Sequence, residues 1–152
     1  MSSEGKSSEG KSPAGKSPAG KSPEGKSPEA KAERQKKIPG EAHPISVTHA
    51  GARMRVTWRG ETIADSAHAL VMHEAAYGPV YYFPRADVAM EKLTSTSHES
   101  WCPYKGAASY FSLPDAENAV WSYETPFEAM REIAGLVAFY PNKVDAITRA
   151  DM

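Results

Sequence analysis

Alternation of apolar and polar side chains predicts β-strands in the second part of the chain. Apolar residues at positions 54, 56 and 58 alternate with polar ones, the period of two that is typical of a strand with one buried face. Arg59-Gly60 then predicts a turn, and residues 62–64 a returning strand. Short apolar or aromatic runs predict further strands over residues 69–74, 80–83, 107–113, 119–123 and 136–140. Such closely spaced short strands are typical of an antiparallel, sandwich-like or barrel-like domain.

One helix is predicted, near residues 126–134. Thr125 is a suitable N-cap, Pro126 suits the first helical position, and Glu128 follows the cap by three residues. The apolar residues of this stretch would share one face: Phe127, Met130, Ile133 and Ala134. Gly135 is suited to end the helix, and a shorter helical turn is predicted between residues 87 and 93. The fold class that follows is mainly β, a small α+β domain with one packed helix.

The first 40 residues follow a different pattern, a repeat of five residues. Six consecutive pentads run from Ser2 to Lys31 and place a lysine at every fifth position. A period of five gives neither a helix nor a strand an apolar face, and the prolines and glycines of the repeat favour an extended, solvated chain. We therefore expect a disordered tail over residues 1–40 and a single globular domain over residues 41–152.

Charge divides the chain at the same place. Residues 1–40 carry nine Lys/Arg against five Asp/Glu, a net charge of +4, whereas residues 41–152 carry nine against fourteen, a net charge of −5. A basic tail can bind nucleic acid or an acidic partner, but the glutamates within the repeat favour a simple tether. The sequence shows no apolar run long enough to span a membrane and no secretory signal, and one cysteine cannot form an internal disulfide. We expect a cytoplasmic protein without a membrane partner.

The densest group of reactive side chains lies between residues 98 and 106. Cys102 precedes Lys105 by three residues, and a nearby cation favours the thiolate, which is the reactive form of cysteine. A histidine of the domain could serve as its base: His68, His73 or His98. Cys102 could equally be a small apolar residue of the core. It is the first of two candidate catalytic residues.

Glu74 is the second candidate catalytic residue. It ends the predicted strand of residues 69–74 and is followed closely by Tyr77. A desolvated carboxyl group beside aromatic side chains can act as an acid or a base. Glu74 could also be an ordinary ion-pair partner, for example of Arg85. Asp65 and Asp87 lie where turns and helix caps commonly take aspartate.

Aromatic residues are dense in this domain, and tyrosines and tryptophans beside a few charges are typical of ligand pockets. The candidate ligand-binding residues are Tyr82, Arg85, Lys105, Tyr110 and Trp121. The same aromatic residues could instead be core residues of strands. His43 and His49 are expected to be solvated at the edge of the ordered region. The histidines of the domain have no compact spacing, so no metal site is expected, and the residues indicate no particular cofactor.

Several stretches of the domain together resemble a known family. They are residues 56–65 (VTWRGETIAD), 81–88 (YYFPRADV), 102–106 (CPYKG), 121–123 (WSY) and 137–140 (VAFY). On these motifs, the chain from about residue 53 to residue 145 resembles the bacterial and fungal family called domain of unknown function 427. The resemblance implies a compact, mostly β domain of β-tent-like architecture, related to methionine sulfoxide reductases of the B type. Several such domains bind zinc through paired C-x-x-C motifs, which this sequence lacks.

The same family is also labelled a nucleotidyltransferase domain. Metal-assisted nucleotidyl transfer needs clustered carboxylates for Mg²⁺ and an element that cradles phosphates. Residues 41–152 contain no P-loop, and three acidic residues could converge only through the fold: Asp65, Glu74 and Asp87. Nucleotidyl transfer therefore stays an alternative.

Three hypotheses of function follow. The first is a domain that binds a small molecule in an aromatic-lined pocket, with Glu74, Arg85 and Lys105 as polar anchors. The second is an enzyme, either nucleotidyltransferase-like or using the chemistry of Cys102 or Glu74. The third is an interaction protein that acts through its basic tail. We favour them in this order, with the first two close together.

Overall fold

The predicted fold class is confirmed. The computed structural model describes residues 36–151, so the pentad repeat and its predicted disorder lie outside the described part. Within that part the chain is mainly β, with three antiparallel sheets. The strands are β1 (Ile45–His49), β2 (Arg53–Trp58), β3 (Glu61–Ser66), β4 (Leu70–Glu74), β5 (Val80–Tyr82), β6 (Thr94–Cys102), β7 (Gly106–Leu113), β8 (Ala116–Ser122), β9 (Val137–Phe139) and β10 (Ala146–Ala150).

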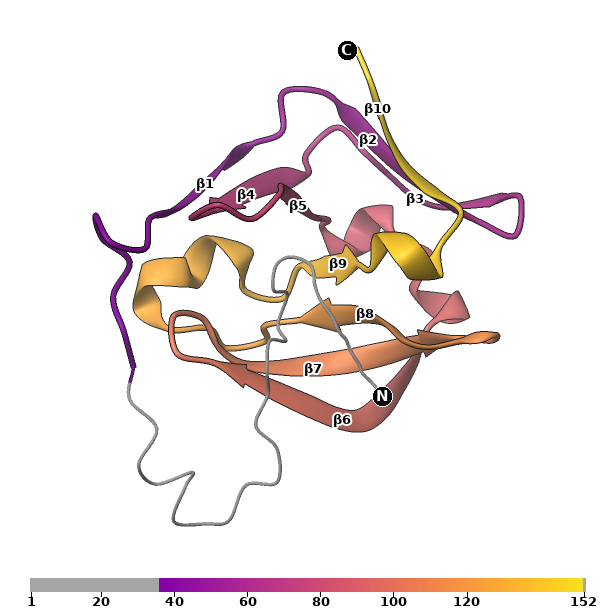
Figure 1. Cartoon of the computed structure of the whole chain (residues 1–152). Helices are drawn as coiled ribbons and strands as arrows, with labels where there is room; N and C mark the ends of the chain where they lie inside the picture. The colour runs from indigo at the N-terminus through magenta and orange to yellow at the C-terminus, as the bar shows by residue number, and fades with distance from the viewer. Residues whose placement is uncertain (1–35, 152) are drawn as a thin grey trace.

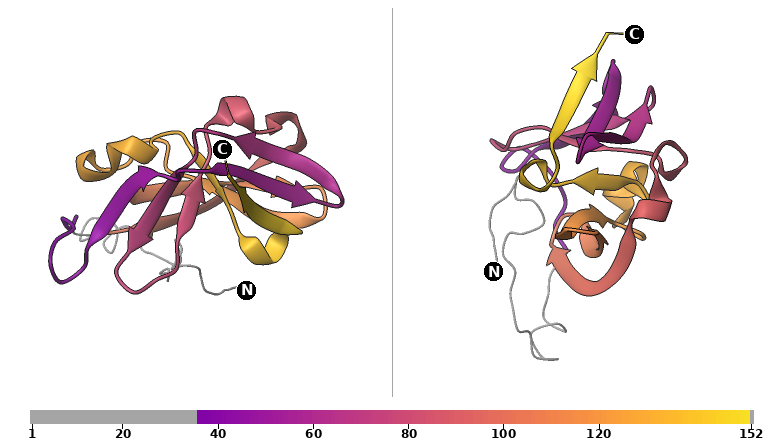
Figure 2. Two further views of the ribbon diagram at one scale, coloured as in Figure 1. Left: turned by 90° about the horizontal axis from the view of Figure 1, so that it is seen from above. Right: turned by 90° about the vertical axis from the view of Figure 1, so that its right-hand side faces the viewer.

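The sheets form two layers (Figure 1). Two three-stranded sheets, with the orders β1-β4-β5 and β10-β2-β3, lie above a four-stranded sheet with the order β6-β7-β8-β9. A bridge between Phe83 and Val137 connects the end of β5 to β9. In the right-hand view of Figure 2, β10 and the curved β6 lie at opposite limits of the described residues. The two layers are thus joined where β5 meets β9, and the buried residues form two hydrophobic clusters.

The β2–β3 hairpin follows directly from its sequence. Met54, Val56 and Trp58 are buried while the residues between them are exposed or half-buried, as the alternation predicts. Arg59 and Gly60 both have positive φ, 52° and 77°, and Trp58 pairs with Glu61 across them. Two successive residues of positive φ make the tight turn whose twist matches that of an antiparallel pair.

The predicted helix is present only as a short 3-10 segment, η3 (Glu128–Ile133). It begins after Phe127 rather than after Thr125, and Met130 leaves helical geometry at φ −116° and ψ 22°. Both flanks are fixed to the sheet, because Phe127 N donates to Lys105 O at 3.0 Å and Gly135 N donates to Tyr123 O at 2.9 Å. This short span leaves room for a tight segment rather than for a regular α-helix. Of the predicted apolar face, Met130 and Ile133 are buried, Phe127 is half-buried and Ala134 is exposed.

Three further 3-10 turns complete the described part: η1 (Arg85–Asp87), η2 (Met90–Lys92) and η4 (Pro141–Lys143). The first two take the place of the helical turn that is predicted between residues 87 and 93. In residues 36–151 no helix has the length and apolar character that crossing a membrane requires.

Candidate functional site

Five side chains meet at one end of the fold, and we call them the Lys105 cluster: His43, Glu74, Cys102, Tyr104 and Lys105. Glu74 is the last residue of β4, Cys102 is the last residue of β6, and His43 lies two residues before β1. The other two lie in the turn between β6 and β7, which the pair Cys102–Gly106 closes. Strand ends of two different sheets therefore supply the cluster.

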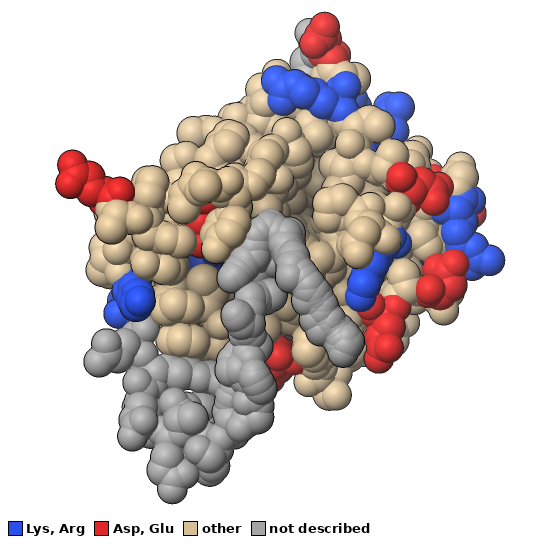
Figure 3. Space-filling model, viewed as in Figure 1, with Lys and Arg blue, Asp and Glu red and all other residues tan. Residues whose placement is uncertain are grey.

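A buried ion pair forms the centre of the Lys105 cluster. The Lys105 side chain is only 5% exposed, and its Nζ donates to Glu74 Oε1 at 2.6 Å, where Glu74 is 13% exposed. The same Nζ lies 3.6 Å from Cys102 Sγ and donates to it. On the face drawn in Figure 3, a small red area and a small blue area lie between tan side chains, whereas most of the other charged atoms stand at the edges of the view. The fold thus holds a cation between a carboxylate and a thiol.

Both members of the pair have shifted pKa values. Burial alone would lower the pKa of Lys105, but the facing Cys102, Glu74 and Tyr82 outweigh burial and raise it. Burial alone would raise the pKa of Glu74, but the charge and hydrogen bond of Lys105, together with His43, outweigh burial and lower it. Lys105 and Glu74 are therefore both charged near neutral pH.

His43 completes the cluster, and the expectation that it is solvated at the edge of the domain is wrong. Its Nε2 lies 2.7 Å from Glu74 Oε2, and its side chain is 25% exposed. An ionised carboxylate only accepts hydrogen bonds, so the imidazole donates. Its ring stacks on Tyr104 with the centroids 4.1 Å apart and the planes 8° apart. A signal for this placement lay in the sequence and was missed: Ile45 and Val47 alternate with polar residues along β1, the strand that pairs with β4.

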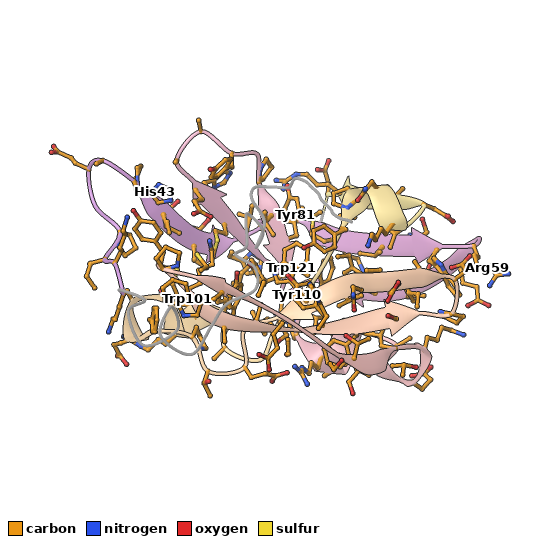
Figure 4. All side chains as sticks on the ribbon, turned by 60° about the horizontal axis from the view of Figure 1, so that its bottom comes forward. His43, Arg59, Tyr81, Trp101, Tyr110 and Trp121 are labelled. Carbon is orange, nitrogen blue, oxygen red and sulfur yellow. The ribbon has the colours of Figure 1, made fainter. Side chains whose placement is uncertain are left out.

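The predicted aromatic cluster is present and lies in the core. Tyr82, Tyr110 and Trp121 are buried and belong to one hydrophobic cluster, at whose margin Cys102 and Tyr140 are half-buried. Trp121 Nε1 donates to the Tyr82 hydroxyl at 3.4 Å, and Figure 4 shows Trp121 and Tyr110 side by side. Burial raises the pKa of Tyr82 to about 12. These rings pack against one another, so a ligand would meet the cluster only at its half-buried margin.

Arg85 lies apart from the Lys105 cluster. Its Nε donates to Gly135 O at 2.7 Å, and its terminal nitrogen donates to Ser122 Oγ at 3.1 Å and to Glu124 at 2.6 Å. The guanidinium also lies 5.5 Å from the centroid of the Phe111 ring. Arg85 therefore holds η3 against β7 and β8. Of the predicted polar anchors, the fold brings together Glu74 and Lys105 and places Arg85 elsewhere.

The three acidic residues that could have formed a nucleotidyl-transfer site each have a separate partner. Asp65 binds Arg53 and Arg55, at 2.7 and 3.2 Å. Asp87 accepts a hydrogen bond from the buried Ser66 at 2.6 Å. Glu74 binds Lys105. In the described residues, no three His, Cys, Asp or Glu side chains are placed to hold a metal ion together.

The opposite end of the molecule is open and strongly charged. A shallow hollow of about 510 Å³ lies between the β2–β3 turn, the β7–β8 turn and η4, and Arg59, Asp115, Glu117, Lys143 and Asp145 contribute to its lining. Arg59 Nε lies 3.6 Å from Asp115 Oδ2, and these side chains are 60% and 53% exposed. Figure 4 shows Arg59 and His43 at opposite ends of the fold. The hollow therefore contains a solvent-exposed ion pair, Arg59–Asp115, that can be compared with the buried pair Lys105–Glu74.

Comparison with known proteins places the chain in a family. A search of curated proteins found no match. The family described as "Domain of unknown function (DUF427)" and labelled NTP_transf_9 matches residues 46–150. This range covers all the strands except Ile45, the first residue of β1, and it includes four of the five members of the Lys105 cluster. The resemblance seen in the sequence motifs is thereby confirmed. The chain belongs to the DUF427 family.

Proposed function

We propose that this domain binds a small polar molecule at the Lys105 cluster. The observation that carries the proposal is the ion pair Lys105–Glu74, which is almost fully removed from water and lies beside the half-buried side chains of Cys102 and Tyr104. Such a place offers a fixed cation, a fixed carboxylate and an aromatic face within a few ångströms. Ligand sites of small domains combine the same elements.

Stability alone gives little reason for a buried ion pair. Removing two charges from water costs several kcal/mol per ion, and well-packed apolar residues of similar size commonly stabilise a protein as well or better. Ionisable groups with shifted pKa values, by contrast, concentrate at functional sites. Lys105 and Glu74 form a buried ion pair, and their pKa values are both shifted. Their chemistry therefore favours a role in binding over a purely structural one.

The proposed site adjoins a hydrophobic cluster that contains Tyr82, Tyr110 and Trp121, and Cys102 packs against this cluster. Lys105 and Tyr82 are close enough to influence each other's pKa, and Tyr82 is fixed in turn by Trp121. A well-packed aromatic floor keeps the ammonium and the carboxylate in one geometry, and preorganised polar groups lose less entropy when a ligand binds. In this proposal the ligand contacts the half-buried side chains of Tyr104 and Cys102, while the buried aromatic residues keep Lys105 and Glu74 in place.

A thermal-shift screen of the full chain tests the proposal. The panel contains small metabolites, including nucleotides with and without Mg²⁺, and is applied to the wild type, to Glu74→Gln and to Asp115→Asn. We expect at least one compound to raise the Tm of the wild type and of Asp115→Asn but not that of Glu74→Gln. Compounds that stabilise all three proteins equally, or a panel in which none raises the Tm of the wild type, would contradict it.

A second candidate function is thiol chemistry at Cys102, and the 3.6 Å contact between Lys105 Nζ and Cys102 Sγ favours it. A thiolate is the nucleophilic form of cysteine, and a neighbouring ammonium stabilises it. The chain contains a single cysteine, so alkylation of the native protein has one source. We expect alkylation to be faster at neutral pH in the wild type than in the double variant Glu74→Gln, Lys105→Met. Equal rates, or reaction only after unfolding, would rule out an activated thiol.

A further inference from the structure

We infer that the slot between the Tyr104 ring and the Glu74 carboxylate is a binding site for a planar nitrogen heterocycle that presents an N–H in the plane of its ring. In the free protein the slot is occupied by the chain's own His43. The inference rests on the proposed function and names the chemical class of its ligand.

The two contacts of His43 define the slot. Its ring is parallel to Tyr104, with an interplanar angle of 8° and a centroid distance of 4.1 Å. Its Nε2 reaches Glu74 Oε2 at 2.7 Å. Stacking acts perpendicular to a ring, whereas the hydrogen bond lies in the ring plane, so together they select flatness and an edge donor. Any five-membered or fused aromatic ring with such an N–H satisfies both.

Lys105 makes the slot selective for a donor. It holds Glu74 Oε1 at 2.6 Å and thereby leaves Oε2 facing the ring. Because Lys105 also keeps Glu74 ionised, the free oxygen can accept a hydrogen bond but cannot donate one. A heterocycle whose edge carries only acceptors would face an unfavourable contact, so the site discriminates between N–H rings and their N-methylated analogues.

His43 lies on a segment that can leave the slot without disturbing the core. The segment of residues 36–43 contains no buried residue. Its backbone is held by a hydrogen bond from Lys37 N to Pro103 O at 2.8 Å and by mutual bonds between Gly40 and His43 at 3.0 and 3.3 Å. Both hydrophobic clusters are built entirely from later residues. Displacement of His43 by a ligand therefore breaks few contacts.

Calorimetric titration of the full chain tests the inference, with benzimidazole as the probe and 1-methylbenzimidazole as its matched control. We expect His43→Ala to bind benzimidazole at least about tenfold more tightly than the wild type does, because the wild type must first release His43. We expect the methylated probe to bind His43→Ala about tenfold more weakly or worse, since it has no N–H for Glu74. Adding Tyr104→Ala to His43→Ala should abolish binding.

His49→Ala is the control variant, because His49 is exposed and contacts Ala67 and Gly51 instead. It should bind no better than the wild type. A second measurement uses the wild type alone: saturating benzimidazole should speed tryptic cleavage after Lys37, as His43 leaves the slot. Equal affinity of His43→Ala for both probes, no gain over the wild type, or unchanged cleavage would overturn the inference.

The two tests fail independently. If a panel compound requires Glu74 while benzimidazole does not enter the slot, the proposed function stands and the ligand class is wrong. If benzimidazole binds as expected while no panel compound raises the Tm of the wild type, the slot accepts the ring, but the proposed function, binding of a small polar metabolite at the Lys105 cluster, is contradicted.

Discussion

The two ends of this domain each carry a cation beside a carboxylate, and the fold treats the two pairs differently. At one end, Lys105 and Glu74 are 2.6 Å apart and 5% and 13% exposed. At the other end, Arg59 and Asp115 are 3.6 Å apart and 60% and 53% exposed. Water screens the second pair and leaves it worth little, whereas the first pair is isolated from water and each charge depends on the other. Burial, rather than the presence of opposite charges, therefore decides how strongly each pair affects the stability of the fold.

The largest expected effect comes from removing one charge of the buried pair. Lys105→Met leaves the Glu74 carboxylate in the interior without its cation, which should cost about 3–5 kcal/mol of the free energy of unfolding. Arg59→Met, the matched change at the solvated end, should cost less than about 1 kcal/mol. Chemical denaturation measures both. Similar losses in the two variants would show that the ends do not differ, and the double variant Glu74→Gln, Lys105→Met should recover much of the loss.

A smaller effect is expected from the glycines of the two turns. Gly106, beside Lys105, has φ +106°, outside the left-handed region that other residues can adopt, whereas Gly60, beside Arg59, has φ +77°. An added Cβ at Gly106 would meet Phe127 at an ordinary 3.7 Å, and one at Gly60 would meet nothing. The cost is therefore backbone strain, about 2–3 kcal/mol for Gly106→Ala and about 1 kcal/mol for Gly60→Ala. Equal costs in denaturation experiments would contradict this account.

The smallest expected effect is a dependence of stability on pH. The pKa of Glu74 is below its ordinary value of 4.5 in the folded protein, mainly because the charge and hydrogen bond of Lys105 outweigh burial. Its contribution to stability is therefore complete above pH 4.5 and is lost as the pH falls through the lowered value. Tm measured from pH 6 downward should fall more steeply for the wild type than for Glu74→Gln, and Asp115→Asn should follow the wild type. Parallel curves for the wild type and Glu74→Gln would contradict the shift.

The strands that sequence reasoning located are those with an apolar face or an aromatic run, such as β2, β4 and β7. The strand it missed most clearly is β6, which reads TSTSHESWC and is largely exposed along its first six residues. β6 is an edge strand that pairs only with β7 in its sheet. An edge strand of this kind buries too little apolar surface to produce a periodic pattern, and polar residues there are common. β10, also at a sheet edge, was missed for a related reason, whereas β1 was missed because its alternation rests on only two half-buried residues, Ile45 and Val47.

For the site, sequence reasoning identified residues whose neighbours along the chain are informative. Cys102 and Lys105 are three positions apart, so their contact across one turn follows from local geometry. Glu74 was identified as a strand-end carboxylate, but its partner was not. His43, 31 positions before Glu74, was expected in solvent and proved to be bound to it. Contacts over such separations depend on strand pairing and register, which no local pattern specifies.

The amino-acid sequence by itself determined the mainly β class, the β2–β3 hairpin and the family, because alternation, turn residues and motifs act over a few neighbouring positions. Only the tertiary structure decided that Lys105 pairs with Glu74, that Arg85 does not join them, and that His43 lies on Tyr104. The physical reason is that a buried charge must find its partner in space, and the partner is supplied by whichever strand end the packing of the sheets brings near. The binding site proposed for this domain depends on that long-range pairing.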